Sequence, residues 1–112
     1  MALPDTRSTD VDKFGLPPYV MERLLAVIHK YPAVRKITLY GSRAKGNYRH
    51  NSDIDIVLNA PRLSWSQFNA IEQEIDDLLL PWKVDLALEH QIENPDLLDH
   101  IARVGITVDQ WG

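Results

Sequence analysis

The spacing of two β-strand patterns limits the possible folds of this chain more than any other feature. Residues 36–40 and 53–58 are rich in β-forming residues, and the segment between them contains Gly41 and Gly46 but no long helical pattern. Parallel neighbouring strands need a crossover of a dozen or more residues, usually a helix. We therefore expect a mixed sheet in a small α/β (α+β) domain, with helices on one face.

Helical spacing of apolar residues accounts for most of the remaining chain. Ser64 and Gln67 have the spacing of a capping box, and the apolar stripe of the helix that they begin extends to Leu79. The elements expected in chain order are a helix between Pro17 and Pro32, strands at 36–40 and 53–58, a helix from Ser64 to Pro81, a strand at 83–88, a helix from Asn94 to Gly105 and a short strand at 106–108.

Length and composition narrow the class of protein. The 112 residues predict a flexible arm at residues 1–15 and a single domain at residues 16–112. The 12 Lys and Arg residues against 16 Asp and Glu residues give a net charge of −4, so nucleic acid is not expected as the main partner. The absence of cysteine, of a membrane-spanning apolar run and of a secretion signal pattern predicts a cytoplasmic protein without a membrane partner.

Three aspartates occupy positions where aspartate is uncommon. Asp53, Asp55 and Asp85 all lie within strand patterns, although aspartate is depleted in strands. Because side chains alternate between the two faces of a strand, Asp53 and Asp55 share the face opposite the apolar residues. Asp85 joins them if its strand lies beside theirs in a suitable register.

Carboxylates gathered in this way require a compensating charge. A divalent cation is the simplest candidate, because Mg²⁺ prefers carboxylate oxygens. Two carboxylates two residues apart can bridge a pair of ions about 4 Å apart, as in two-metal phosphoryl transfer. The alternative is a solvated face on which these aspartates pair with Lys or Arg.

A turn that suits phosphate binding comes directly after the first strand. Its sequence is Gly41-Ser42-Arg43-Ala44-Lys45-Gly46, and residues 42–44 are predicted to begin a short helix. Backbone N–H groups at a helix start bind phosphate oxygens, and glycine permits their close approach. Ser42 adds a hydroxyl, and Arg43 and Lys45 add cations. The turn lacks the Walker A order, so its weight comes from its place just before the aspartates.

Together these motifs resemble the nucleotidyltransferase superfamily of DNA polymerase β. The signature of that superfamily is Gly-Ser, about ten residues, Asp-x-Asp and a third carboxylate on a later strand. Here Gly41-Ser42 is followed by ten residues, by Asp53-Ile54-Asp55 and later by Asp85. The resemblance implies a polymerase β-like fold, ATP as the substrate and Mg²⁺, with two ions, as the cofactor.

The resemblance also implies a role for each motif residue. The carboxylates would bind the metal ions and act in catalysis, and Asp85 would also help to deprotonate the acceptor hydroxyl. The turn would hold the β- and γ-phosphates and neutralise the departing pyrophosphate. The residues implied for catalysis and metal binding are Asp53, Asp55 and Asp85, and those implied for nucleotide binding are Gly41, Ser42, Arg43 and Lys45.

The small size of the chain is most similar to that of the minimal nucleotidyltransferases, the MntA-like antitoxins. Their partners are HEPN-domain toxins of the HepT kind. This resemblance implies a protein adenylyltransferase that moves AMP from ATP to the toxin and silences its ribonuclease activity. Two alternatives remain open: an antitoxin that masks its toxin sterically without catalysis, and a nucleotidyltransferase that acts on a small molecule or an RNA end.

One acidic segment also has two interpretations. Glu72, Glu74, Asp76 and Asp77 lie largely off the apolar stripe of their predicted helix. They form either a solvated face or a docking surface for a basic partner.

Overall fold

The computed structural model describes residues 14–110. Its elements are α2 (Pro18–Ile28), β1 (Lys36–Tyr40), α3 (Gly41–Lys45), β2 (Ile54–Asn59), α4 (Trp65–Asp76), β3 (Val84–Leu88), the 3-10 helix η1 (Glu89–Gln91), α5 (Pro95–Val104) and β4 (Ile106–Gln110). This order confirms the predicted succession of helices and strands. Residues 1–13 of the predicted arm lie outside the described residues. Phe14, which the prediction also placed in the arm, is buried in the core.

The four strands form one mixed sheet in the order β3-β2-β1-β4. β1 pairs antiparallel with both β2 and β4, whereas β2 pairs parallel with β3. The antiparallel β1–β2 connection needs no long crossover, and the parallel β2–β3 connection is made through α4. The mixed sheet predicted from the strand spacing is therefore confirmed.

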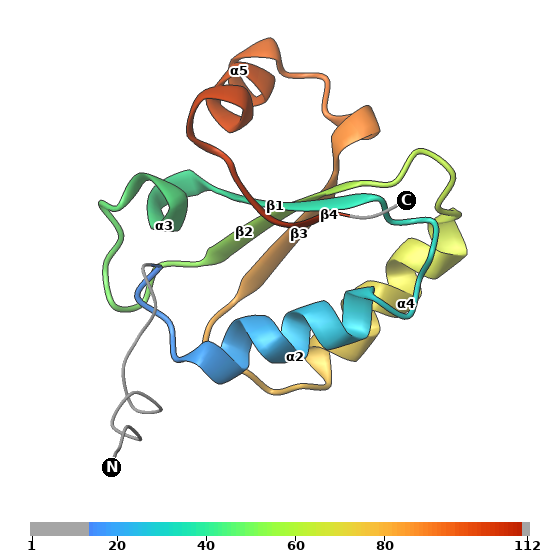
Figure 1. The fold of residues 1–112 in the computed structure, drawn as a ribbon, viewed down its shortest axis with the longest axis horizontal. Coiled ribbons are helices and arrows are strands. Elements are labelled where there is room, and N and C mark those ends of the chain that lie inside the picture. The colour runs from blue at the N-terminus through green and yellow to red at the C-terminus, as the bar shows by residue number, and fades with distance from the viewer. Residues whose placement is uncertain (1–13, 111–112) are drawn as a thin grey trace.

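The two longest helices, α2 and α4, cover one face of the sheet (Figure 1). The side chains of Ile54, Ile56 and Leu58 on β2 point to that face, and all three are 0% exposed. α5 lies on the opposite side of the sheet (Figure 1), and none of its residues is buried. The expectation of helices on one face thus holds for α2 and α4, while α5 partly covers the other face.

The helix ends follow local chemistry. Ser64 Oγ accepts a hydrogen bond from the Gln67 backbone N–H, and Gln67 Oε1 accepts one from the Ser64 backbone N–H. This confirms the capping box at the start of α4. Asn94 Oδ1 accepts from the backbone N–H groups of Asp96 and Leu97, which confirms the predicted start of α5.

The end of α4 differs from the prediction. The helix stops at Asp76, before the proline at position 81, and Leu79 has a positive φ of 54°. Leu79 is 86% exposed, so its predicted place in the apolar stripe is wrong. The chain has to reverse direction here to enter β3, and the left-handed residue makes that reversal. Among residues 14–110, no helix has the length and apolar character of a membrane span.

Candidate active site

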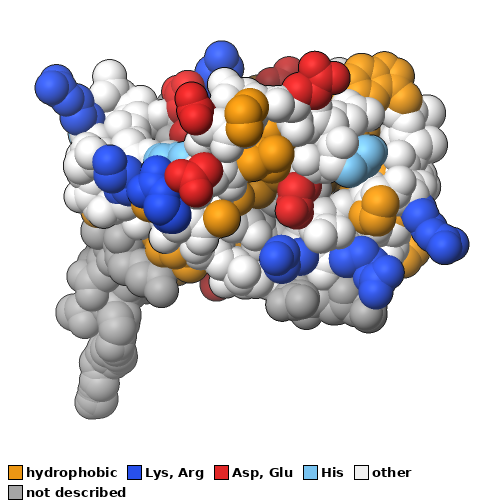
Figure 2. Space-filling view, turned by 90° about the horizontal axis from the view of Figure 1, so that it is seen from above, with side chains coloured by type: hydrophobic (Ala, Val, Ile, Leu, Met, Phe, Trp, Pro, Cys, Tyr) orange, Lys and Arg blue, Asp and Glu red, His pale blue; other side chains and the backbone are white. Residues whose placement is uncertain are grey.

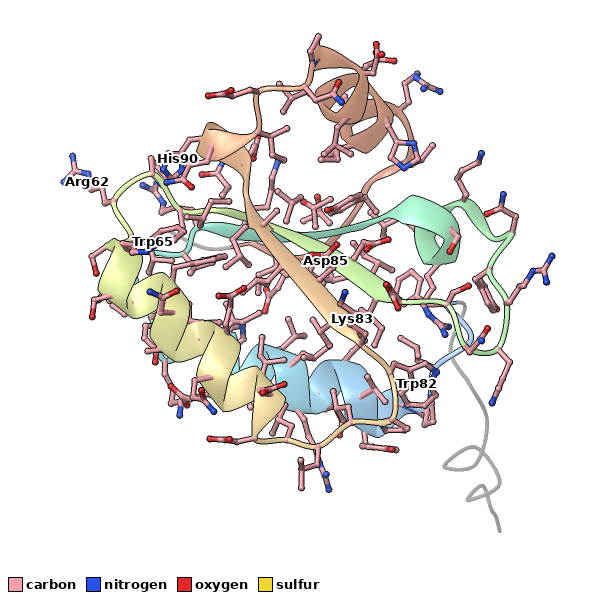
Figure 3. All side chains as sticks on the ribbon, turned by 180° about the vertical axis from the view of Figure 1, so that it is seen from behind. Arg62, Trp65, Trp82, Lys83, Asp85 and His90 are labelled. Atoms are coloured by element: carbon pink, nitrogen blue, oxygen red, sulfur yellow. The ribbon has the colours of Figure 1, made fainter. Side chains whose placement is uncertain are left out.

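The register of β2 with β3 brings two of the predicted carboxylates together. Asp55 is the direct parallel partner of Asp85, and on its other side Asp55 pairs with Tyr40 of β1. Direct partners on neighbouring strands project from the same face of a sheet. Asp53 lies immediately before β2 and is exposed, two residues from Asp55. Figure 3 shows Asp85 on β3, with Lys83 two residues before it on the same strand segment.

Negative charge is concentrated at this position. Burial raises the pKa of Asp55, and the neighbouring carboxylates of Asp85 and Asp53 raise it further, while His100 and Lys83 oppose the shift. Burial, with Asp55 and Asp85 beside it, also raises the pKa of Tyr40 to about 12. The site therefore disfavours further negative charge and favours a bound cation.

The chemistry of this donor set fits Mg²⁺. Carboxylate oxygens are the ligands that Mg²⁺ prefers, and a divalent ion would relieve the repulsion that raises the pKa of Asp55. Across residues 14–110, no three His, Asp or Glu side chains are already arranged closely enough to enclose a metal ion. Mg²⁺ usually keeps several waters and substrate phosphates as ligands, so two protein carboxylates suit it without an all-protein cage.

The glycine at the start of the turn packs against one carboxylate. Gly41 has a φ of 76°, and a Cβ at this position would lie 2.3 Å from Asp55 Oδ2. Any larger residue would therefore both strain the backbone and displace the carboxylate. The structure thus places the start of the Gly41–Lys45 turn beside the aspartate pair, as the sequence motif predicted.

Sequence analysis did not identify His100 as a neighbour of this site. The Gly41 backbone N–H donates to His100 Nε2 at 3.2 Å, and the ring of His100 meets the ring of Tyr40 edge-on with 6.3 Å between centroids. The sequence feature that could have identified His100 is its spacing of three residues from Leu97, which places it on the apolar stripe of α5. α5 thus contributes a polar group to the face that carries the aspartates.

The comparisons with known proteins agree with this geometry. The family described as polymerase beta, nucleotidyltransferase matches residues 22–109, which include the turn and all three aspartates. The chain belongs to the polymerase β nucleotidyltransferase family. No curated protein sequence matches it.

Solved structures with this nucleotidyltransferase fold include toxin–antitoxin complexes. A crystal structure of a toxin–antitoxin with AMP-PNP is 25% identical, with a TM-score of 0.64, covering 85% of this chain and 74% of the other. The crystal structure of the toxin–antitoxin MntA-HepT is 20% identical, with a TM-score of 0.62, covering 83% of this chain and 72% of the other. The similarity to the second structure shows the fold alone.

In this nucleotidyltransferase, Arg43 does not have the predicted role. Its side chain is 1% exposed, and its guanidinium donates to the backbone carbonyls of Phe14, His50 and Ser52 at distances from 2.8 to 3.2 Å. A buried guanidinium held by these carbonyls cannot reach a phosphate in the solvent. The structure therefore corrects the expectation that Arg43 binds the nucleotide. The sequence could not distinguish it from Lys45, because both are cations in the same short helix.

The other two residues of the turn stay accessible. Ser42 is half-buried in the first turn of α3, and Lys45 is exposed at its end. Gly46 follows in the left-handed conformation, with a φ of 94°, and ends the helix. Lys45 is thus the cation of this turn that remains available for phosphate.

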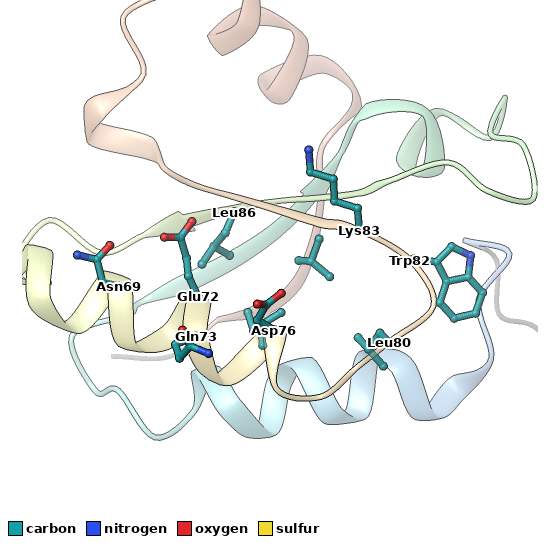
Figure 4. Close-up of a pocket in the computed structure, with 10 residues that line it drawn as sticks. Asn69, Glu72, Gln73, Asp76, Leu80, Trp82, Lys83 and Leu86 are labelled. Carbon is teal, nitrogen blue, oxygen red and sulfur yellow. The ribbon is translucent and has the colours of Figure 1, made fainter.

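A groove of about 470 Å³ lies between α4 and β3 (Figure 4), and neither Asp55 nor Asp85 lines it. Val84 and Leu86 line it, and on a strand these residues face away from Asp85. Glu72 and Asp76 also line it. The groove therefore opens on the helix side of the sheet.

The acidic residues of α4 lie in two different environments. Glu74 accepts hydrogen bonds from Lys30 Nζ and Tyr31 Oη, which tie α4 to the segment after α2. Glu72 and Asp76 are exposed at the groove. Seen from the α5 side, the molecular surface instead shows acidic and basic side chains interspersed around a central group of hydrophobic ones (Figure 2).

Proposed function

We propose that this nucleotidyltransferase transfers AMP from ATP, with Mg²⁺, to a hydroxyl group of a partner protein, as the antitoxin of a toxin–antitoxin pair. One observation carries the proposal: the strand register sets Asp55 opposite Asp85, with the Gly41 turn packed against Asp55. A protein that only bound its partner would need neither the carboxylate pair nor a glycine held against it.

The similar structures support the choice of nucleotide and partner. The structure that is 25% identical to this chain is a toxin–antitoxin with AMP-PNP, which is a non-hydrolysable ATP analogue. The MntA-HepT complex has the same fold. We therefore propose ATP as the donor and a HEPN-domain toxin, similar to HepT, as the acceptor, in the cytoplasm.

The proposed reaction exchanges one phosphorus–oxygen bond for another. The acceptor hydroxyl oxygen attacks the α-phosphorus of ATP, the bond from that phosphorus to the bridging oxygen breaks, and pyrophosphate leaves. The proton of the hydroxyl passes to a carboxylate oxygen of Asp85. Bound Mg²⁺ supplies neutralisation of phosphate charge, and it would be held by Asp53, Asp55 and Asp85.

The turn has a positioning role in this mechanism. Gly41 and Ser42 bind the β- and γ-phosphates, and the exposed ammonium group of Lys45 stabilises charge on the departing pyrophosphate. Rate enhancement then comes mainly from orientation and from electrostatic stabilisation of developing charge.

A labelling experiment tests the proposal. The purified protein is incubated with ATP labelled on the α-phosphate, Mg²⁺ and lysate of its source cell, and the products are separated on a gel. The negative control is Asp53→Asn/Asp55→Asn. A matched control, Asp77→Asn/Glu93→Gln, removes the same charge at two exposed positions outside the site.

Label on one protein band that is lost only with Asp53→Asn/Asp55→Asn would support protein adenylylation and would deliver the acceptor for identification. Label on a small molecule or an RNA end would move the acceptor to that class. A toxin still neutralised by the double variant, with no gain in mass, would replace the proposal with steric masking.

A further inference from the structure

We infer that Arg43 is a positioning residue of this active site, which holds the backbone before Asp53 and does not touch the nucleotide. The inference rests on the proposed function only for the identity of the reaction. The positioning itself is argued from the contacts of Arg43. Arg43 lies in α3, between the phosphate-binding positions Ser42 and Lys45, and its side chain is directed into the protein.

The backbone at Asp53 needs support from outside the sheet. The strand pairing of β2 begins at Ile54, so Asp53 precedes the register that fixes Asp55 opposite Asp85. Sheet hydrogen bonds thus orient Asp55 and Asp85, whereas the loop before β2 orients Asp53.

Arg43 holds that loop by its carbonyl groups. Nε and one terminal nitrogen of the guanidinium both donate to the Ser52 carbonyl, at 3.1 and 3.0 Å. The same terminal nitrogen donates to the His50 carbonyl at 3.2 Å. The planar guanidinium suits this forked arrangement, which a single ammonium group does not reproduce. Because Ser52 directly precedes Asp53, these bonds fix the start of the carboxylate-bearing segment.

Aromatic rings and a second donor reinforce the loop. The guanidinium carbon lies 5.1 Å from the ring centroid of Tyr48 and 5.9 Å from that of Trp82. Trp82 Nε1 also donates to the His50 carbonyl, at 3.0 Å. Trp82 is followed by Lys83, whose carbonyl accepts from the Ile54 N–H at 2.9 Å. The Arg43 cluster therefore connects the phosphate-binding turn with the segments that lead into both β2 and β3.

The other terminal nitrogen connects the cluster to the beginning of the described chain. It donates to the Phe14 carbonyl at 2.8 Å. A Cβ at Gly15 would lie 2.2 Å from a ring carbon of Tyr48, so this segment packs closely on the loop. Four segments thus meet at one buried cation: α3 itself, the segment at Phe14, the loop at residues 48–52 and the segment at Trp82. A cation that served only to bind a phosphate would need none of these contacts.

The test compares Arg43→Lys and Arg43→Gln with Lys45→Gln, a matched loss of a cation in the same helix. Two readouts are measured: hydrogen exchange of the amides at residues 47–53, and the transfer kinetics with their Mg²⁺ dependence. For both Arg43 variants we expect exchange at least about tenfold faster in the loop and a kcat about 10- to 100-fold lower. The Mg²⁺ concentration for half-maximal rate should rise, with the KM for ATP changed by less than about twofold.

Lys45→Gln should show the opposite pattern, with an increased KM for ATP and unchanged exchange in the loop. An Arg43→Lys protein that keeps the wild-type kcat and exchange would overturn the inference, because retained charge would then be sufficient. A change confined to the KM for ATP in both Arg43 variants would also overturn it and would restore a direct phosphate contact.

Two further measurements keep the inference separable from the proposed function. If wild-type protein transfers no AMP, the proposed function fails. The role of Arg43 can still be tested by measuring the affinity of the protein for Mn²⁺, as a probe ion in place of Mg²⁺, together with hydrogen exchange in the loop. Equal affinity and equal exchange in wild type and Arg43→Lys would reject that role. If the Arg43 variants do not fold, Trp82→Phe removes the indole N–H donor to the His50 carbonyl while keeping an aromatic ring at this position. Faster exchange of residues 47–53 in that variant supports the positioning cluster, and unchanged exchange rejects it.

Discussion

The two faces of β2 are built for different purposes. On the helix side, Ile54, Ile56 and Leu58 are completely buried beneath α2 and α4. On the other side, Asp55 lies opposite Asp85 and is only partly buried, with a pKa raised by burial and by its acidic neighbours. The apolar face stabilises the fold, whereas charge repulsion on the acidic face opposes it, and we expect a bound cation to relieve that repulsion. One strand thus carries stability on one side and a destabilising site on the other.

The strongest test of this contrast is Asp55→Asn. The variant should lose transfer by about a thousandfold or more, because it removes a carboxylate that we propose to bind Mg²⁺, with a charge stabilisation worth several kcal/mol. It should nevertheless fold and melt at a higher temperature than wild type without metal, because an amide carries no charge into the cluster. Rate assays and thermal melts of the same preparation measure both effects. Lower stability without metal would contradict the account of the acidic face.

The corresponding change on the apolar face is Ile56→Ala, at the neighbouring residue. We expect it to reduce the free energy of unfolding by about 3 kcal/mol, since it leaves a cavity at a fully buried position. Denaturant unfolding with an unchanged slope provides the measurement. A loss below about 1 kcal/mol would mean that α2 and α4 can close over the missing atoms.

A third prediction concerns Gly41→Ala, with Gly46→Ala as its matched control. Both glycines have a positive φ, so each alanine should cost about 1–2 kcal/mol of stability from backbone strain. Only the alanine at position 41 would also meet Asp55 Oδ2, since nothing lies within 4 Å of a Cβ at Gly46. Transfer should therefore be lost in Gly41→Ala and retained in Gly46→Ala. Equal activity in the two variants would separate the turn from the carboxylate.

The pH dependence of stability sharpens the same contrast. A carboxyl whose pKa is raised in the folded state favours folding at low pH, and this contribution is lost as pH rises from about 3.9, the unfolded value, through the folded pKa. In metal-free protein, the stability advantage of Asp55→Asn over wild type should therefore be small near pH 3 and grow towards pH 7. Mg²⁺ should reduce that advantage at pH 7. Thermal melts across this range, with a chelator or with Mg²⁺, test the sign; a constant difference would contradict it.

The sequence was sufficient to predict the elements of the acidic face but not their contacts. Alternation along the strands correctly placed Asp55 and Asp85 on the polar face, because a period of two is a local property. Their pairing depended on which strands are neighbours and in what register, which is set by the whole sheet. The roles proposed for the site residues stay predictions, namely Asp53, Asp55, Asp85, Gly41, Ser42 and Lys45.

Arg43 and His100 show what local patterns leave out. Arg43 stands among positions that the sequence motif predicts to bind phosphate, yet its partners are carbonyls at Phe14, His50 and Ser52, which only the folded chain brings together. His100 is distant from Gly41 in sequence and reaches it because α5 lies over the polar face. Both sets of contacts depend on long-range packing, which cannot be predicted from the spacing of residues along the sequence.

The smallest predicted effect lies in the turn between α4 and β3, outside both faces of β2. Leu79 combines a φ of 54° with 86% exposure, so its side chain contributes little burial and its backbone is strained. Leu79→Gly should relieve that strain and raise the free energy of unfolding by up to about 1 kcal/mol, offset in part by the greater freedom of glycine in the unfolded chain. Leu79→Asn tolerates the same conformation with less of that freedom and should stabilise the protein at least as much.

Transfer activity should stay at the wild-type level in both variants, because this turn only connects α4 to β3. Denaturant unfolding beside the transfer assay measures the two quantities. A destabilised Leu79→Asn would show that the leucine contributes packing that its exposure does not reveal.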